Sequence, residues 1–499
     1  MGILRPKSVE QSIKDTEEPE FQLREALGPL DLTILGIGVI IGTGLFILTG
    51  QAAANFAGPA VTLSFVVSGV ACALAALCYA EFASTIPVAG SAYTFSYASI
   101  GELFAWVIGW DLILELIVGA SAVSVGWSGY FGQILKSFFG ITLLPAVTEA
   151  GVVNLPAVGI ALLLTVILVI GIRLSSSVNV AITVIKLAVV FFFIGLGIFL
   201  VNTANWEPFI PSAGGGVASA SKEAAAEPSH LQAVIGAEQQ SFGFAGVITA
   251  AAIVFFAYIG FDVVATTSEE ARNPQRDLPI GILASLGICT ILYVVVSLIL
   301  TGMVPYTELG SDAPLAAALS ERGQDWAAGL ISIGVLAGLT SVIMILMLGQ
   351  SRVAFAMSRD NLLPRFLARV HQRFRTPYVI TIITGVVVAL MAGFIDLQRL
   401  AELTNIGTLF AFILVSISVI VLRRTQPDLR RAFRTPLVPV VPILSTLICL
   451  YLMVSLPLGT WARFVGWMIL GLVIYFAYSM RKSRLAQEEH TKETGGEDR

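Results

Sequence analysis

A single lysine lies inside one of the long apolar stretches of this sequence, where a charged amine is least expected. Lys186 follows a run of uncharged residues (179–185) and precedes another apolar run. Taking an amine out of water favours its neutral form, so a buried lysine can exchange a proton. Lys186 is therefore a candidate proton-coupling residue. The alternative is a structural cation that bonds to backbone carbonyls.

Two acidic residues and one tyrosine are further candidates for proton chemistry in apolar surroundings. Glu115 lies deep in an apolar stretch that also contains Asp111, and we take Glu115 as a second proton-coupling candidate. Ionisable side chains within apolar segments commonly mark ion and proton paths. Tyr293, in the middle of a later apolar stretch, is either a proton relay or a packing residue.

Two glycine-containing segments interrupt apolar stretches that otherwise have the composition of continuous helices. The first is Gly-Ile-Gly-Val-Ile-Ile-Gly-Thr-Gly-Leu-Phe (36–46), and the second is Phe-Phe-Ala-Tyr-Ile-Gly-Phe-Asp (255–262). Each glycine costs a helix interior about 1 kcal/mol relative to alanine. Close helix packing through small residues is one explanation. The other is that both helices are unwound at these points.

Unwinding inside an apolar medium would create a binding site for an amino acid zwitterion. The N–H groups at the start of a half-helix, with a dipole equivalent to about +0.5 charge, attract a carboxylate. The carbonyls at the end of another half-helix attract an ammonium group. Backbone groups left unpaired in this way are tolerated only beside a cavity. No charged side chain is needed, in agreement with the absence of Lys and Arg from both segments.

The composition places these segments in a membrane. Of the 499 residues, 56% are hydrophobic and only 12% are charged, whereas a soluble domain is about 25% charged. A helix needs about 20 apolar residues to cross a bilayer. We predict 12 transmembrane helices, near 30–52, 59–84, 101–134, 156–172, 177–201, 244–264, 278–303, 327–357, 377–395, 403–423, 438–457 and 462–480. The glycine segments fall in the first and sixth, the pattern of a transporter site between two repeats.

The positions of cysteine, histidine and charge argue against catalysis and nucleic-acid binding. The four cysteines lie inside apolar runs without metal-ligand spacing, and the three histidines lie outside those runs. An intramembrane enzyme would need clustered His, Cys or carboxylate groups. The net charge of −4 gives no sign of a nucleic-acid partner. We expect no enzyme activity, no metal site and no cofactor, with H+ as the coupling ion.

The basic residues set the expected orientation and segment boundaries. Most of the 29 Lys and Arg residues fall on one side of the predicted spans, and basic loops remain in the cytoplasm. We therefore expect a multi-pass protein of the cell membrane with both termini cytoplasmic. The expected segments are a cytoplasmic leader (1–28), a first five-helix repeat (29–201), a flexible extracellular loop (202–243), a second five-helix repeat (244–424), two further helices (425–484) and a disordered cytoplasmic tail (485–499).

Four blocks of sequence, which together cover the first ten predicted spans, match the motifs of a known superfamily. They are Gly-Val-Ile-Ile-Gly-Thr-Gly-Leu-Phe (38–46), Cys-Tyr-Ala-Glu-Phe-Ala (78–83) with Pro-Val-Ala-Gly-Ser-Ala-Tyr (87–93), Phe-Ala-Tyr-Ile-Gly-Phe-Asp (256–262) with Glu-Glu (269–270) and Asn-Pro (273–274), and Arg-Val-Ala-Phe-Ala-Met-Ser-Arg-Asp (352–360) with Leu-Pro (363–364) and Thr-Pro (376–377). The chain resembles the amino acid–polyamine–organocation superfamily and, within it, a bacterial-type member of the cationic amino acid transporter family. This resemblance implies an all-α integral membrane protein with a LeuT-type fold. That fold has two inverted five-helix repeats with discontinuous first and sixth helices, and two peripheral helices.

The resemblance also implies roles for individual residues. It implies that the substrate carboxylate is bound by Ile40, Ile41, Gly42, Thr43 and Gly44. It implies that the ammonium group is bound by the carbonyls of Phe256, Ala257 and Ile259, and that Met344 belongs to the side-chain pocket. In proton-coupled relatives a fifth-helix lysine takes the place of sodium, and Lys186 matches it. An acidic third-helix residue important for transport aligns with Glu115.

The side-chain pocket leaves the substrate open between two classes. The resemblance implies that it includes Gly338, Ser341 and Met344 or Ile345, which are small or apolar, with no carboxylate to pair a cationic side chain. The family name suggests arginine or lysine, whereas this pocket suggests alanine or another neutral amino acid. We expect a proton-coupled symporter for uptake of an L-amino acid. The alternative is an amino acid or amine exchanger without proton coupling, and the expected partners are membrane lipid, with sterol or a small accessory membrane peptide as further candidates.

Overall fold

The computed structural model describes residues 27–85, 93, 97, 101–148, 152–171, 176–212, 242–268, 271–374 and 376–483. Within these ranges the chain is helical, with a single isolated β-bridge between Leu27 and Ala271. Nearly all of the predicted leader (1–28), most of the predicted loop (202–243) and the predicted tail (485–499) lie outside the described residues. The fold is therefore built from helices alone in the part that can be described.

The helices follow one another along the whole described chain. Those that form the body of the protein are α2 (Pro29–Ile40), α3 (Thr49–Ala52), α4 (Val61–Thr85), α6 (Glu102–Phe139), α7 (Leu155–Ile170), α8 (Ser176–Gly197), α10 (Gly243–Val254), α11 (Phe261–Thr266), α12 (Pro274–Met303), α13 (Pro314–Glu321), α14 (Asp325–Arg359), α15 (Tyr378–Phe394), α16 (Leu397–Thr425), α17 (Val440–Val454), α18 (Leu458–Ile474) and α19 (Met480–Lys482). Short π- or 3-10-helical turns join several of them, including η1 (Gly44–Leu48), η2 (Ala53–Ala57) and η6 (Phe255–Tyr258).

Several of these helices have the length and composition of membrane spans. In the described chain, eight helical stretches are long and apolar enough to cross a membrane, and α2, α7, α15 and α17 are shorter apolar helices. Every apolar run predicted from the sequence overlaps one or more helices. An all-helical membrane architecture therefore agrees with the composition.

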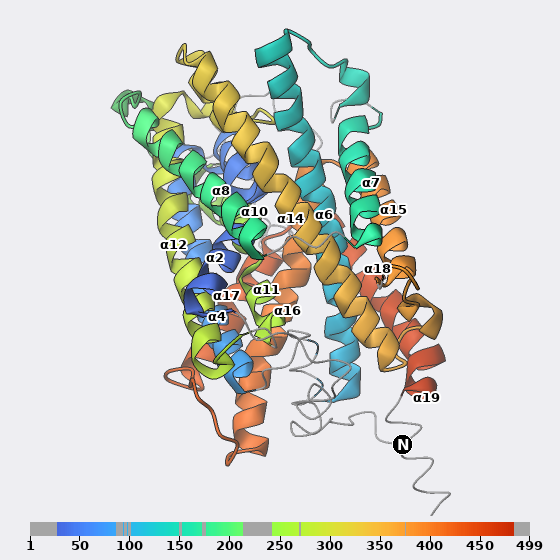
Figure 1. The fold of residues 1–499 in the computed structure, drawn as a ribbon. Coiled ribbons are helices and arrows are strands. Elements are labelled where there is room, and N and C mark those ends of the chain that lie inside the picture. The colour runs from blue at the N-terminus through green and yellow to red at the C-terminus, as the bar shows by residue number, and fades with distance from the viewer. Residues whose placement is uncertain are drawn as a thin grey trace, which may run out of the picture.

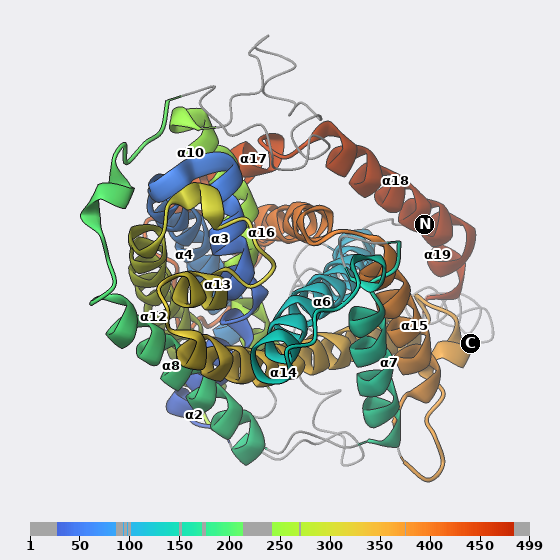
Figure 2. The same cartoon turned by 90° about the horizontal axis from the view of Figure 1, so that it is seen from above.

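The helices run side by side in one bundle (Figures 1 and 2). α6 packs along α14, and α4 packs along α12, which also contacts α2. α18 lies at the edge of the view in Figure 2. Burial agrees with this arrangement, because 83% of the apolar window in 243–265 is buried inside the protein but only 22% of that in 458–482. The segment that contains α10 and α11 therefore belongs to the centre.

A buried ion cluster holds the end of α4 against the connection that follows α16. The Arg423 guanidinium donates two hydrogen bonds to the Glu81 carboxylate, at 3.0 and 2.7 Å. The Arg431 guanidinium lies 3.3 Å from the same carboxylate, and the Thr435 amide donates to it at 2.8 Å. The Glu81 side chain is only 2% exposed. Its charge is therefore balanced by protein groups, which is the condition for a stable buried carboxylate.

Candidate functional site

The first glycine segment is a break in a helix. α2 ends at Ile40, and Ile41 is extended (φ −72°, ψ 100°) before helical turns resume at Gly44. The Leu45 and Phe46 amides both donate to the Gly42 carbonyl. The amides that precede them have no acceptor within the new helix, as at any helix start. A β-carbon on Gly44 would overlap the backbone of Ala257, so this glycine allows two segments to approach closely.

The second segment is also broken. α10 passes into the 3-10 turn η6, Ile259 is extended (ψ 133°), and α11 begins at Phe261. Gly260 has φ 122°, a conformation that favours glycine. The Asp262 side chain accepts a hydrogen bond from the Gly260 amide at 3.2 Å and so stabilises the turn. Both interruptions expected from the glycine pattern are present.

Tyr293 on α12 connects the two breaks. Its hydroxyl lies 2.8 Å from the Ile40 carbonyl and 2.7 Å from the Ala257 carbonyl. The side chain is fully buried. Tyr293 therefore does more than pack against its neighbours, because its hydroxyl bonds to backbone groups that the breaks leave without helix partners.

Asn405 on α16 is a polar contributor that the sequence reasoning missed. Its amide nitrogen donates to the carbonyls of Ala252 at 2.7 Å and Ile253 at 3.0 Å, near the end of α10. These are carbonyls of a helix end, which need partners when the helix stops. The only available signal was an amide side chain within an apolar run, and its partners lie more than 150 residues away.

Lys186 on α8 reaches the helix before the first break. Its amine donates to the Gly38 carbonyl at 2.5 Å, and the residue is 1% exposed. A β-carbon on Gly338 of α14 would lie 2.8 Å from the lysine methylenes, so that glycine makes room for the side chain. Among the described residues, no carboxylate forms an ion pair with this amine. The contact suits both predicted roles, a proton-coupling residue and a structural cation.

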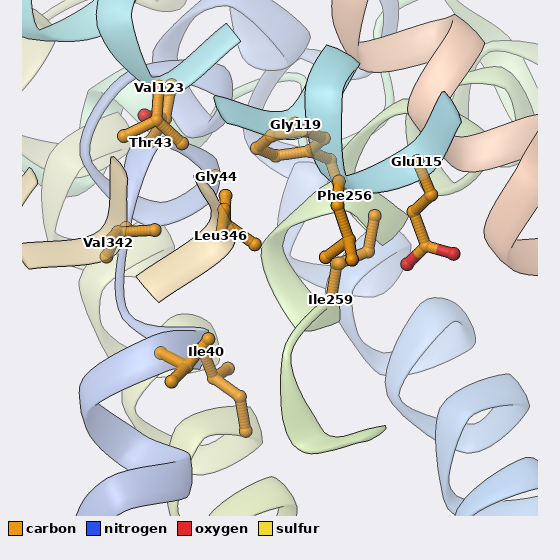
Figure 3. A pocket seen from close by; sticks show the side chains of 13 residues that line it. Ile40, Thr43, Gly44, Glu115, Gly119, Val123, Phe256, Ile259, Val342 and Leu346 are labelled. Atoms are coloured by element: carbon orange, nitrogen blue, oxygen red, sulfur yellow. The ribbon is translucent and has the colours of Figure 1, made fainter. Parts of the chain in front are cut away.

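A cavity lies between the two breaks and faces α6 and α14 (Figure 3). In this conformation about 20 Å³ of it is accessible to the centre of a water molecule, and part of it is open. It is lined by Val39, Ile40, Gly42, Thr43, Gly44, Glu115, Leu116, Gly119, Val123, Phe256, Ile259, Val342 and Leu346. Figure 3 shows Val342 and Leu346 on one side and Glu115 with Ile259 on the other. Apart from Thr43 and Glu115, the side chains that face the cavity are apolar.

Most predicted substrate-binding residues meet at this cavity. Ile40, Gly42, Thr43, Gly44, Phe256 and Ile259 line it. Ile41 and Ala257 are next to lining residues in the chain without lining it themselves. Tyr293 and Lys186 lie outside the lining. Tyr293 contacts carbonyls of both broken segments, and Lys186 contacts a carbonyl of the helix before the first break.

Two observations concern the predicted side-chain pocket. Met344 does not line the cavity, whereas Val342 and Leu346 do. The reason is helical periodicity, since residues four apart share a face and residue 344 points elsewhere. The pocket was also expected to lack a carboxylate, but Glu115 lines it. The sequence showed an acidic residue in the third run without showing which way it faced.

Buried acidic side chains gather next to the cavity. Asp111 and Glu115 lie one turn apart on α6, and they are 0% and 2% exposed. In the described part of the chain, both Asp111 carboxylate oxygens and one Glu115 oxygen have no hydrogen-bond partner. Glu115 therefore offers an unfilled polar contact to whatever occupies the cavity.

Comparison with known proteins identifies one matching family and several similar proteins. A family model described as amino acid permease matches residues 27–477. The chain is 48% identical to the branched-chain amino acid permease BcaP of Bacillus subtilis strain 168, over 97% of this chain and 99% of that protein. It is 47% identical to the methylthioribose transporter of the same organism, over 93% and 95%. It is 36% identical to the vacuolar cationic amino acid transporter 4 of Arabidopsis thaliana, over 86% and 68%.

Proposed function

Because the chain belongs to the amino acid permease family, we propose that it is a proton-coupled symporter that takes up an L-amino acid across the cell membrane. In this proposal it has 12 transmembrane helices in a LeuT-type arrangement, with repeats over 29–201 and 244–424 and both termini cytoplasmic. The observation that carries the proposal is the pair of broken helices on either side of one cavity.

The zwitterion is held by backbone groups at the two breaks. The amides of Gly42, Thr43 and Gly44 precede a helix start, where partial positive charge attracts the substrate carboxylate. The carbonyls of Phe256, Ala257 and Ile259 receive the ammonium group. A carbonyl oxygen has two lone pairs, so Ala257 can bond to Tyr293 and still accept from the substrate. The two ends of one small molecule thereby bridge both broken helices.

A neutral aliphatic side chain fits the rest of the cavity best. Val123, Val342 and Leu346 surround the space beyond the breaks, and each presents only carbon atoms. Apolar lining with few polar groups is typical of sites for small apolar ligands. One relative is named as a branched-chain amino acid permease, and another as a transporter of methylthioribose. We assign this chain a branched or straight aliphatic amino acid.

Proton coupling is assigned to Lys186, with Glu115 and Tyr293 as further participants. Lys186 is buried, and its amine has one backbone acceptor among the described residues, as expected of an amine that gains and loses a proton. When the amine is neutral, its hold on the Gly38 carbonyl weakens, and the helix before the first break is freed to move. Proton release and substrate release would then favour the same conformation, which is the condition for coupling.

Uptake into proteoliposomes tests this function. Wild-type protein should accumulate a labelled aliphatic amino acid when an inward pH gradient is imposed, and less without it. Lys186→Ala should still exchange internal for external substrate but should not accumulate it. Lys136→Ala is the matched control, because Lys136 is exposed at the end of α6 and should leave accumulation unchanged.

Two outcomes would contradict the proposal, and they differ. If wild-type uptake of an amino acid ignores the pH gradient, proton coupling is wrong and the exchanger alternative stands. If no amino acid in a panel of neutral, cationic and aromatic compounds is transported while methylthioribose is, the zwitterion site itself is wrong.

A further inference from the structure

Gly119, which lines the cavity, has no packing reason to be a glycine. Gly119 lies in the interior of α6, where glycine weakens a helix relative to alanine. A β-carbon placed on it would lie 3.6 Å from a Leu346 methyl and 3.7 Å from a Thr404 methyl. Both are ordinary van der Waals distances. The surrounding protein would therefore accept an alanine at this position.

Two other glycines near the site, Gly44 and Gly126, differ in this respect. A β-carbon on Gly44 would overlap the backbone of Ala257, and one on Gly126 would lie 2.6 Å from Ile47. At Gly44 the facing backbone excludes any side chain, and at Gly126 the side chains of Ile47 and Thr43 would have to move. At Gly119 the missing side chain leaves empty space instead, because this residue lines the cavity.

That space is where a substrate side chain would extend. Gly119 lies one helical turn from both Glu115 and Val123 on the cavity face of α6. Leu346 faces it from α14. We propose that Gly119 sets the largest side chain that the transporter accepts, by leaving room for branched four-carbon side chains. This inference rests on the proposed function and concerns only the size of the substrate.

The proposal makes a sharp distinction between substrates. A methyl group at position 119 occupies volume that leucine or isoleucine needs and that alanine does not reach. One methylene more or less in an apolar pocket changes discrimination by about 10- to 200-fold. The contacts of the zwitterion with the two breaks remain as they were, since neither break is near enough to Gly119 to appear among its closest atoms.

The test is uptake by Gly119→Ala of labelled alanine, valine and leucine, measured as initial rates at low concentration. Leucine uptake should fall at least about tenfold relative to alanine uptake, and alanine uptake should stay within about twofold of wild type. Gly349→Ala is the matched control, because its β-carbon would also meet a leucine methyl, Leu116, at 3.8 Å, but residue 349 does not line the cavity. The control should preserve the wild-type ratio.

A second variant links the effect to space rather than to folding. Combining Gly119→Ala with Leu346→Ala removes carbon atoms from the facing wall and should restore leucine uptake. An unchanged leucine-to-alanine ratio in Gly119→Ala would overturn the proposal. So would equal loss of all three substrates, which would assign Gly119 to packing. Failure of the proposed function is distinguishable, because wild-type protein would then transport none of the three.

Discussion

The contact of Tyr293 with both breaks gives a prediction whose size can be worked from the structure. Tyr293→Phe removes the hydroxyl that lies 2.8 and 2.7 Å from the Ile40 and Ala257 carbonyls. The ring should stay in place, since it packs on Phe65 and Tyr258 at centroid distances of 5.4 and 5.3 Å. The variant therefore isolates the hydrogen-bonding group.

Leaving a buried acceptor without its partner costs about 1–3 kcal/mol. A phenol has one proton to donate, so at any moment one of the two carbonyls receives the full bond. A cost of about 1–3 kcal/mol corresponds to a factor of roughly 5 to 150 in an equilibrium constant. Because the hydroxyl stabilises the geometry of both breaks, its removal should destabilise the conformation that binds substrate by this amount.

The assay is the initial rate of substrate uptake at a concentration far below saturation, together with the thermal unfolding midpoint of the purified protein. Tyr293→Phe should lower uptake by roughly 5- to 150-fold. Tyr258→Phe is the matched control, since the Tyr258 hydroxyl also bonds to a buried carbonyl, that of Phe65, at 2.7 Å. It should lower the unfolding midpoint similarly with a smaller effect on uptake. Equal uptake by the two variants would refute the reasoning that links the hydroxyl to the site.

Two further predictions concern close approach and the buried ion cluster. Gly44→Ala should abolish uptake, because its β-carbon would overlap the facing broken segment. Gly349→Ala should retain uptake, because its β-carbon would meet its nearest atom at 3.8 Å and residue 349 does not line the cavity; uptake by both variants at wild-type rates would show that the contact of Gly44 does not matter. Glu81→Ala should destabilise the protein by about 3–5 kcal/mol, because it leaves the buried Arg431 charge without its carboxylate. Thermal unfolding in detergent measures this, and Arg399→Ala, which removes only an exposed ion pair worth about 0–1 kcal/mol, is the comparison.

Local composition was sufficient to predict the apolar helices and their interruptions. Each apolar run is long enough to satisfy its own backbone hydrogen bonds as a helix, which any segment in hydrocarbon must do. The glycines of 36–46 and the Gly260 turn weaken the helix at their own positions, so each break can be predicted from its local sequence. Glycine at 260 is needed for a positive φ, which is a local property too.

The contacts across the bundle could be decided only by the tertiary structure. Glu81 and Arg423 are separated by 342 residues, and the hydroxyl of Tyr293 reaches a carbonyl 253 residues earlier. Sequence spacing predicts neither contact, because the chain between the two residues can follow many different paths. The sequence likewise does not specify which face of α14 lines the cavity. Met344 was therefore expected there, whereas Val342 and Leu346 line it. A sequence determines that a helix is apolar all round, but the rotation of that helix about its axis is set by the helices packed against it.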